Sequence, residues 1–218
     1  MPGLSRKNPV LSPAALRLYA ITDSSRLGGR SLLETAAAVL RGGATMLQFR
    51  EKNLALAEFV ALGRELRSLA ARFGAPFIVN DRVEAAAALD ADGVHLGQAD
   101  MDAGAARARL GPDKIIGVSA RSVAQALKAE AAGADYLGVG AVFATTTKTD
   151  AAAVSSGALG EICRAARIPV VAIGGIKAGN AALLRGSGIR GIAAAAALFA
   201  APDPEAAARE LLRAWEYD

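Results

Sequence analysis

The sequence predicts an α/β protein that folds as a single-domain (β/α)8 barrel, the TIM-barrel architecture. Eight short strand-like runs alternate with longer alanine-rich helical runs from about residue 17 to the C-terminus. No linker rich in Pro, Gly or Ser interrupts this alternation, which favours one domain. The length of 218 residues is slightly below the usual size of such a barrel. A doubly wound open sheet is the structural alternative.

The expected strands are short apolar runs, each bounded by turn signals. They span residues 17–21, 44–49, 76–80, 93–96, 114–118, 135–140, 169–173 and 190–193. We assign residues 1–13 to an N-terminal extension and residues 14–218 to the barrel domain.

The expected helices fill the intervals between the strands. In residues 54–73, apolar side chains recur at helical spacing, at Leu62, Leu66, Leu69 and Phe73. Several helices end at a glycine just before the next strand, as at Gly74 and Gly133, and glycine suits a left-handed helix C-cap.

The composition excludes several kinds of chemistry. The chain has one histidine and one cysteine, too few ligands for a zinc site or an iron–sulfur cluster and too few thiols for a disulfide. The formal net charge of +4 is spread along the chain without basic runs, so nucleic acid is not an expected partner. The remaining chemistry uses oxygen, amine and guanidinium groups.

No segment predicts membrane insertion or export. The longest apolar stretch, residues 191–201, is too short to span a bilayer, and residues 1–13 lack the apolar core of a signal peptide. We therefore expect a cytoplasmic protein in which Cys163 is a reduced thiol.

Polar residues gather where the expected strands end, which is where a barrel of this kind has its active site. After the second strand, Gln48, Arg50 and Lys52 alternate onto one side. The ends of the next three strands and the longest loop, residues 141–157, add Asn80, Asp81, His95, Asp100, Ser119, Thr145, Thr147 and Lys148. These side chains are the candidates for function.

Asp81 and Asp100 are the candidate metal ligands. Two carboxylates without a histidine or thiol partner form a hard oxygen site, which suits Mg²⁺ shared with a phosphate ligand. The structural alternative is that Asp81 starts a capping box with Glu84, and that Asp100 and Asp102 cap the fourth helix. The position of both aspartates at neighbouring strand ends, opposite Arg50, favours the metal.

The remaining candidates suit phosphate groups. Arg50, Lys52 and Lys148 can neutralise a pyrophosphate, although most such side chains are simply solvated. Gly174-Gly175 and the small residues 193–197 follow the last two strands, where backbone N–H groups of many barrels hold a phosphate. Their structural alternative is a tight turn and a close-packed helix.

Two aromatic side chains are expected inside the barrel. His95 alternates in phase with Gly93 and Gly97, so it points inward, where a structural histidine is favoured over a proton shuttle. Tyr19 lines the interior and can pack against a flat ring. The sequence gives His95 no partner for nucleophilic catalysis.

Six segments in this order resemble the thiamine-phosphate synthase family, and the resemblance covers nearly the whole chain from Tyr19 to the last helix. They are Gln48-Phe49-Arg50-Glu51-Lys52, Val79-Asn80-Asp81, His95-Leu96-Gly97-Gln98-Ala99-Asp100, Gly117-Val118-Ser119, Thr145-Thr146-Thr147-Lys148 and Ile173-Gly174-Gly175-Ile176. The resemblance implies an enzyme that joins hydroxymethylpyrimidine diphosphate, an aminopyrimidine, to a thiazole phosphate, giving thiamine monophosphate and pyrophosphate.

The resemblance also implies roles for the candidates. The pyrimidine diphosphate would be held by Gln48, Arg50, Lys52, Asn80, Ser119 and Lys148, with Arg50, Lys52, Ser119 and Lys148 catalytic and Tyr19 and His95 lining the site. Mg²⁺ would be bound by Asp81 and Asp100. The thiazole phosphate would be held by Thr145, Thr147, Gly175 and the backbone of Ala195 and Ala196. The family ionises the pyrimidine substrate to a carbocation that the thiazole nitrogen captures, which requires leaving-group stabilisation and no protein nucleophile.

Three positions depart from the family pattern. Ala144 replaces a proline, Arg121 replaces a histidine or threonine, and Ala196 replaces a serine that holds the thiazole phosphate. The missing hydroxyl should weaken that contact by about 1.5–3 kcal/mol. Two alternative functions are a thiazole tautomerase-like isomerase and a non-catalytic paralogue that binds thiazole phosphate or thiamine phosphate.

Overall fold

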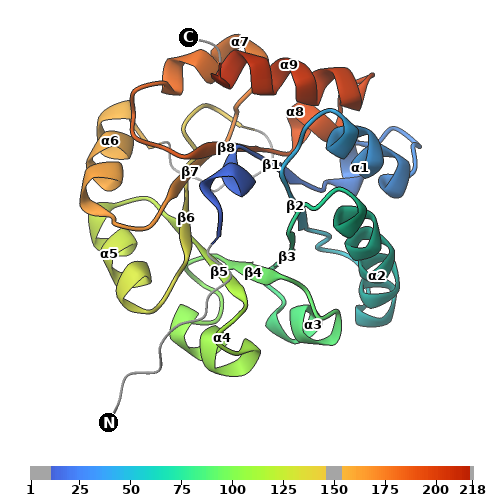
Figure 1. The fold of residues 1–218 in the computed structure, drawn as a ribbon, viewed down its shortest axis with the longest axis horizontal. Coiled ribbons are helices and arrows are strands. Elements are labelled where there is room, and N and C mark those ends of the chain that lie inside the picture. Colours follow the sequence, from blue (N-terminus) through green and yellow to red (C-terminus); the bar gives the residue numbers. More distant parts are fainter. Residues whose placement is uncertain (1–10, 146–153, 217–218) are drawn as a thin grey trace.

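In the computed structural model, eight parallel strands form a closed barrel surrounded by helices (Figure 1). The structure describes residues 11–145 and 154–216. The strands pair in sequence order, and β8 pairs with β1 through Ile192 and Leu18. This closure confirms the predicted (β/α)8 barrel and excludes the open sheet.

Each predicted strand overlaps an observed one. The strands are β1 Leu18–Ile21, β2 Met46–Phe49, β3 Phe77–Asn80, β4 Gly93–Leu96, β5 Ile115–Ala120, β6 Tyr136–Val139, β7 Val170–Ile173 and β8 Gly191–Ala194. Strand β5 continues two residues beyond the predicted end because Ala120 still pairs with Val139 of β6.

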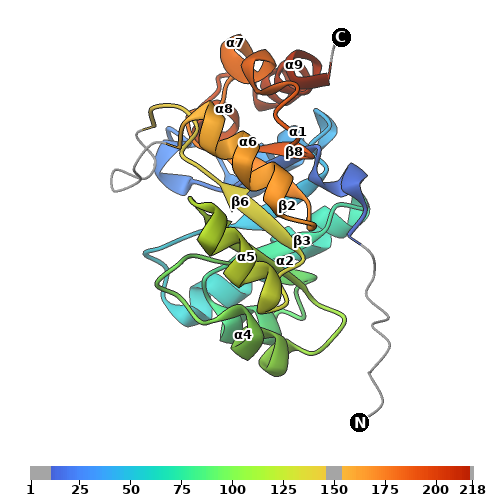
Figure 2. The same cartoon turned by 90° about the vertical axis from the view of Figure 1, so that its left-hand side faces the viewer.

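Helices cover the outside of the barrel, as the side view shows for α4, α5 and α6 (Figure 2). They are α1 Leu32–Arg41, α2 Leu56–Arg72, α3 Val83–Ala88, α4 Ala103–Leu110, α5 Val123–Ala131, α6 Ser156–Ala165, α7 Ala178–Ala181, α8 Ala196–Phe199 and α9 Pro204–Glu216. Short 3-10 helices are η1 Pro13–Leu16, η2 Ser24–Arg26 and η3 Ala182–Leu184. The glycines predicted after two helices, Gly74 and Gly133, have φ angles of 64° and 93°. Among the described residues, no helix is long and apolar enough to cross a membrane.

The interior of the barrel is a core of its own, separate from the layer between strands and helices. It contains Leu16, Tyr19, Ile21, Met46, Ile78, Ile115, Tyr136, Val171 and Ala193. Glycines in the strands make room for its rings: a Cβ atom at Gly117 would lie 2.1 Å from the ring of Tyr136. The interior therefore accommodates large polar rings because glycines on the neighbouring strands leave the space that a side chain would fill.

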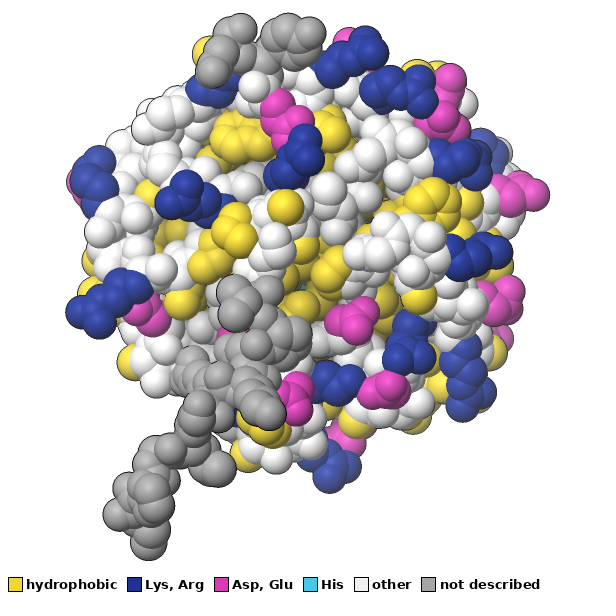
Figure 3. All heavy atoms as spheres, in the orientation of Figure 1, with side chains coloured by type: hydrophobic (Ala, Val, Ile, Leu, Met, Phe, Trp, Pro, Cys, Tyr) yellow, Lys and Arg dark blue, Asp and Glu magenta, His cyan; other side chains and the backbone are white. Residues whose placement is uncertain are grey.

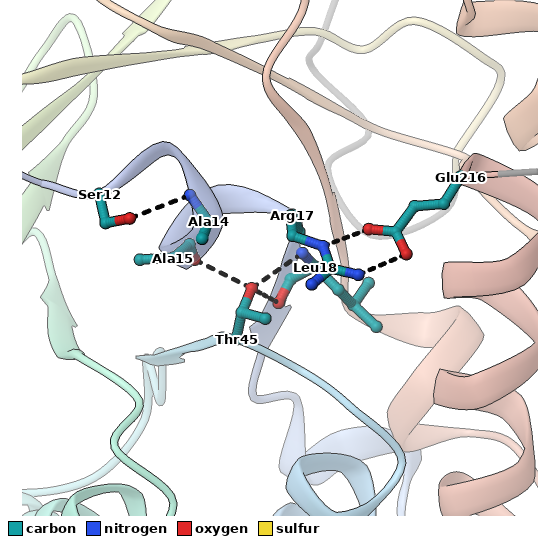
Figure 4. A network of polar contacts seen from close by, with 7 residues as sticks. All are labelled: Ser12, Ala14, Ala15, Arg17, Leu18, Thr45 and Glu216. Atoms are coloured by element: carbon teal, nitrogen blue, oxygen red, sulfur yellow. Dashed lines mark hydrogen bonds and ion pairs between the residues drawn. The ribbon is translucent and has the colours of Figure 1, made fainter.

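The 3-10 helix η1 covers the N-terminal end of the barrel, and Figure 4 shows its polar contacts. Leu16 of η1 is fully buried in the interior core. The hydroxyl of Thr45 lies 3.0 Å from the carbonyl oxygen of Ala15 and accepts the N–H of Leu18 at 3.0 Å. Arg17 forms a two-pronged ion pair with Glu216, which ties the end of α9 to the start of β1. This end of the barrel is built for stability.

Charged side chains on the face drawn in Figure 3 are spread around its periphery, with acidic groups between the basic ones. This distribution of the described residues agrees with the absence of basic runs in the sequence. Most ion pairs among the described residues are exposed, such as that of Arg109 with Glu84. Exposed pairs of this kind add little to stability.

Arg107 of α4 is an exception, and its removal should destabilise the fold. Its guanidinium donates to Asp135 at 2.6 Å and to the carbonyl oxygens of Gly133 and Lys114, while Asp135 also accepts the N–H of Ile116 at 2.7 Å. Arg107→Ala removes the ion pair with Arg107 from this mostly buried carboxylate. We expect the free energy of unfolding, measured by urea denaturation, to fall by about 2–4 kcal/mol.

The exposed Arg109 on the same helix provides the control for Arg107. Arg109→Ala breaks only the solvated pair with Glu84 and should leave the urea midpoint nearly unchanged. Equal losses in the two variants would show that the network around Asp135 has no special role.

Candidate functional site

The predicted rim residues of β2, β3, β4 and β5 lie together at the C-terminal end of the barrel. Asn80 of β3 pairs in register with His95 of β4, and Gly117, two residues before Ser119, pairs with the same histidine. Gln48, Asn80 and His95 are all buried polar side chains. Buried polar groups are costly unless they find partners, so their concentration here marks a site.

A chain of hydrogen bonds crosses the barrel interior beneath this rim. Gln48 Nε2 donates to Tyr19 Oη at 2.7 Å, and Tyr19 Oη lies 2.9 Å from Tyr136 Oη. Tyr136 Oη lies 2.9 Å from His95 Nδ1, and His95 Nε2 lies 3.0 Å from Ser119 Oγ. The inward direction of Tyr19 and His95 is as the strand alternation predicted.

Tyr136 is a member of this chain that the sequence analysis did not identify. It is fully buried at the start of β6, and burial raises the pKa of its phenol and that of Tyr19. Both phenols therefore stay protonated, and each donates one hydrogen bond. The available signal was the glycine at 117, which leaves space for a large ring from the neighbouring strand.

Arg50 follows β2 and is fixed through its backbone. Its N–H donates to the hydroxyl of Thr22 at 2.9 Å, and its carbonyl accepts from the same hydroxyl at 3.3 Å. The Nε atom of its guanidinium is buried, and no described residue accepts a hydrogen bond from it. A buried cationic donor without a protein acceptor fits an anionic ligand.

The loop after β2 carries Lys52 and is held from both sides. The buried carboxylate of Glu51 accepts hydrogen bonds from the N–H and hydroxyl of Ser24. Arg82 donates to the carbonyl oxygens of Lys52 and Leu54, each at 3.1 Å. Lys52 itself is exposed, so its ammonium group projects from a backbone that is fixed.

Arg82 is a second residue that the sequence analysis missed. Besides its two bonds to the loop, its guanidinium lies over the ring of Phe59, 4.6 Å from the centroid. A single guanidinium thus connects α2, α3 and the loop of Lys52. The sequence contained no local signal for this role because its partners are more than twenty positions away in the chain.

The capping-box interpretation of Asp81 is wrong. Helix α3 begins after Arg82, which is its N-cap and makes no side-chain capping bond. Asp81 has a φ angle of 60°, in the left-handed region that non-glycine residues rarely adopt. Its N–H donates to the carbonyl oxygen of His95 at 2.8 Å, which holds it beside β4. Such strained residues concentrate at functional sites.

The second aspartate, Asp100, is also not a helix cap. Asp102 is the N-cap of α4 and accepts from the N–H of Gly104 at 2.8 Å, as predicted. Asp100 instead accepts from the N–H of Gly97 at 2.6 Å, in the turn just after β4. Both candidate metal ligands therefore belong to the rim, not to the first turn of a helix.

Mg²⁺ fits this pair of carboxylates only if substrate phosphates and waters supply its other ligands. The described residues contain no group of three or more His, Cys, Asp or Glu side chains that would hold a metal by themselves. Mg²⁺ commonly keeps several waters and binds through one or two carboxylates and substrate phosphates. Asp81 and Asp100 meet that requirement in type and number.

The loops after β6 and β7 lie against each other. The N–H of Phe143 donates to Gly174 at 3.0 Å, and a Cβ atom at Gly175 would lie 2.3 Å from the carbonyl oxygen of Ala144. Gly174 and Gly175 have φ angles of 100° and 66°. Glycine is therefore required here for residues 143 and 144 to lie against the end of β7.

The other predicted phosphate-binding residues follow β8 or fall in the long loop. Ala195 and Ala196 are partly buried at the start of α8, immediately after β8. Thr145 is the last described residue of its loop, and Thr147 and Lys148 lie outside the described residues. Arg121 precedes Ser122, the N-cap of α5, at the predicted helix start.

Comparisons with known proteins agree on one family. The family model described as thiamine monophosphate synthase matches residues 18–198. Thiamine-phosphate synthase of Chloroflexus aurantiacus is 50% identical over 196 residues, 89% of this chain and 90% of the relative. That of Ruminiclostridium cellulolyticum is 45% identical over 195 residues, 89% of this chain and 93% of the relative. Among solved structures, thiamine phosphate pyrophosphorylase from Pyrococcus furiosus has 43% identity and a TM-score of 0.86, with 94% and 97% of the two chains covered.

Proposed function

This chain belongs to the thiamine monophosphate synthase family, and from that premise we propose how its residues carry out the reaction. It is a transferase of thiamine biosynthesis that makes thiamine phosphate. Its substrates are small molecules: a pyrimidine diphosphate and a thiazole phosphate. We place the reaction in the cytoplasm, where Cys163 stays reduced.

The buried Nε atom of Arg50 carries the proposal for the diphosphate. Arg50 binds the diphosphate with its fork of N–H donors, and Lys52 and Lys148 add positive charge as the leaving group departs. Asn80 and Ser119 donate further hydrogen bonds, and Gln48 orients the pyrimidine. These contacts strengthen as negative charge develops on pyrophosphate, which is the condition for catalysis.

Asp81 and Asp100 would hold Mg²⁺, which supplies further charge neutralisation on the leaving diphosphate. The chain's own residues then control the fate of the cation left by bond cleavage. The C–O bond to pyrophosphate breaks with its electron pair, and the thiazole nitrogen attacks the pyrimidine carbocation. Buried Tyr19, Gln48 and His95 exclude water from this cation.

The thiazole phosphate occupies the other half of the rim in this proposal. Thr145, Thr147 and Gly175 hold it from the loops after β6 and β7, and the backbone of Ala195 and Ala196 holds it from the end of β8. Binding both substrates at the same rim makes their reaction effectively unimolecular. The thiazole nitrogen is itself the nucleophile, so the reaction requires none from the protein.

Product analysis tests the activity against its two alternatives. With both substrates and Mg²⁺, we expect pyrophosphate and thiamine phosphate in equal amounts. In a reaction without thiazole phosphate, we expect no pyrophosphate at short reaction times. Ligand binding without pyrophosphate release would indicate a non-catalytic paralogue. Conversion of a thiazole substrate alone would indicate an isomerase.

Restoring the missing hydroxyl at position 196 should improve thiazole phosphate binding. Ala196→Ser adds a donor at the first residue of α8, so the KM for thiazole phosphate should fall by about tenfold while kcat is retained. Ala200→Ser, at the exposed opposite end of α8, is the control and should change neither constant. An unchanged or higher KM in Ala196→Ser would mean that residue 196 does not face the phosphate.

Loss of Arg82 should act through Lys52. Arg82→Ala removes both bonds to the loop, so the KM for the pyrimidine diphosphate should rise by about tenfold, with that for thiazole phosphate unchanged. In a double-mutant cycle with Lys52→Ala, the two effects should be strongly non-additive. Additive effects would assign Arg82 to stability alone.

A further inference from the structure

Tyr136 lies at the centre of the hydrogen-bond chain inside the barrel, and the direction of that chain has a consequence for the rim. We propose that Tyr136 is a positioning residue that holds the His95 proton on Nε2, which leaves the hydroxyl of Ser119 to donate to the diphosphate. The inference rests on the proposed function for the identity of the ligand. It assigns a role to a residue that is separated from that ligand by His95 and Ser119.

The direction follows from what each group can donate. The amide nitrogen of Gln48 can only donate, so Tyr19 Oη accepts from it. The buried proton of Tyr19 needs an acceptor, and among the described residues Tyr136 Oη is the one within hydrogen-bond distance. Tyr136 Oη therefore accepts from Tyr19 and gives its proton to His95 Nδ1. A neutral imidazole that accepts at Nδ1 carries its proton on Nε2.

The proton on Nε2 determines what Ser119 presents. His95 Nε2 donates to Ser119 Oγ across 3.0 Å, which occupies an oxygen lone pair and leaves the hydroxyl proton for another acceptor. Ser119 is partly exposed at the rim, so an oxygen of the diphosphate can accept that proton. At the opposite end, Gln48 keeps its carbonyl oxygen as an acceptor. The hydrogen-bond chain thus ends in an acceptor, the Gln48 carbonyl oxygen on β2, and a donor, the Ser119 hydroxyl on β5.

Packing keeps the rings from turning out of this arrangement. A Cβ atom at Gly117 would lie 2.1 Å from the Tyr136 ring, and one at Gly138 would lie 2.9 Å from His95 Cε1. The rings of Tyr136 and Tyr19 meet edge to face with centroids 5.9 Å apart. Burial also raises the pKa of both phenols, so neither proton is lost. The direction of donation is therefore fixed by the amide of Gln48 and preserved by close packing.

The single histidine of the chain makes the proposal directly measurable. In untagged protein labelled with ¹⁵N-histidine, every imidazole signal belongs to His95, and two-bond proton–nitrogen spectra identify the protonated nitrogen. We expect the proton on Nε2 in the wild type. A proton on Nδ1 would mean that the chain runs in the opposite direction, and would overturn the proposal without any variant.

Tyr136→Phe removes the hydroxyl and keeps the ring. We expect His95 to populate both tautomers, kcat/KM for the pyrimidine diphosphate to fall by about tenfold or more, and the KM for thiazole phosphate to stay unchanged. An unaltered His95 spectrum, or an altered spectrum with unaltered kinetics, would overturn the positioning role. Because the spectrum requires no turnover, absence of synthase activity would count against the proposed function and not against the direction of the chain.

Two controls separate the hydrogen-bond chain from general loosening of the interior. Tyr19→Phe disconnects Gln48 from Tyr136 and removes the donor that fixes the direction, so His95 should lose its preference for the Nε2 proton although the Tyr136 hydroxyl remains. Val171→Ala makes a cavity in the same interior core and should lower the Tm without changing the His95 spectrum. A mixture of tautomers in Val171→Ala would show that packing, not the Tyr136 hydroxyl, controls the histidine.

Discussion

Asp81→Asn and Asp100→Asn should each lower turnover by about 100-fold or more and weaken its dependence on Mg²⁺. Each change removes one of the two carboxylates proposed to share the metal with the diphosphate. The metal would then bind through one carboxylate fewer, and the leaving group would lose neutralisation in the transition state. Titration of Mg²⁺ at saturating substrates measures both effects, as a lower maximum rate and a higher midpoint.

The chain offers matched controls for both aspartates. Asp90 also has a positive φ, 47°, and its exposed side chain pairs with Lys114, so Asp90→Asn repeats the Asp81 change away from the rim. Asparagine tolerates the left-handed region, which keeps the backbone in both variants. Asp102→Asn repeats the Asp100 change at the N-cap of α4, where asparagine caps as well as aspartate. Full activity in Asp81→Asn and Asp100→Asn would remove the metal assignment.

The strands were predictable because each satisfies a local pattern, whereas the capping alternative for Asp81 fails because of a contact with a neighbouring strand. The pattern of Asp81 and Glu84 is that of a capping box, but the N–H of Asp81 is held by the carbonyl of His95 on β4. This bond draws Asp81 into the rim, and the helix starts after Arg82. A sequence pattern describes only neighbours along the chain, so it could not reveal this competition.

Tyr136 and Arg82 were missed for a related reason. Tyr136 contacts Tyr19 and His95, which come from β1 and β4, so its role exists only once the barrel closes. Arg82 reaches the loop after β2 from the start of α3. The candidate site residues themselves were predictable because a barrel places them at strand ends, where a single strand shows which side chain comes last.

The two ends of the barrel differ in one respect, which is whether every buried polar side-chain atom has a partner among the described residues. At the N-terminal end, Thr45, Asp92 and Asp135 accept the N–H groups of Leu18, Phe77 and Ile116, at the starts of β1, β3 and β5. These side chains satisfy the backbone. At the C-terminal end, the Nε atom of Arg50 is buried and unsatisfied by the described residues. The guanidinium of Arg50 is therefore available to a ligand, at a cost to the stability of the free protein.

That cost makes Arg50 the most informative single residue. Arg50→Met replaces the guanidinium by an apolar side chain that also packs well in irregular spaces. We expect kcat/KM for the pyrimidine diphosphate to fall by about 1,000-fold, because charge on the leaving group loses its two-pronged donor. Arg50→Lys restores charge without the fork and should recover only part of this loss.

The same substitution should not destabilise the protein, and this separates a ligand-binding arginine from a structural one. Removing a buried donor that lacks an acceptor relieves a desolvation penalty, so the Tm of Arg50→Met without ligand should equal or exceed that of the wild type. Pyrophosphate with Mg²⁺ should raise the Tm of the wild type and not that of the variant. Arg64→Met, an exposed cation on α2, controls for the loss of one charge and should respond to pyrophosphate as the wild type does. If Arg50→Met instead lowers the Tm and still responds to pyrophosphate, Arg50 serves the fold, and the leaving group is held by other residues.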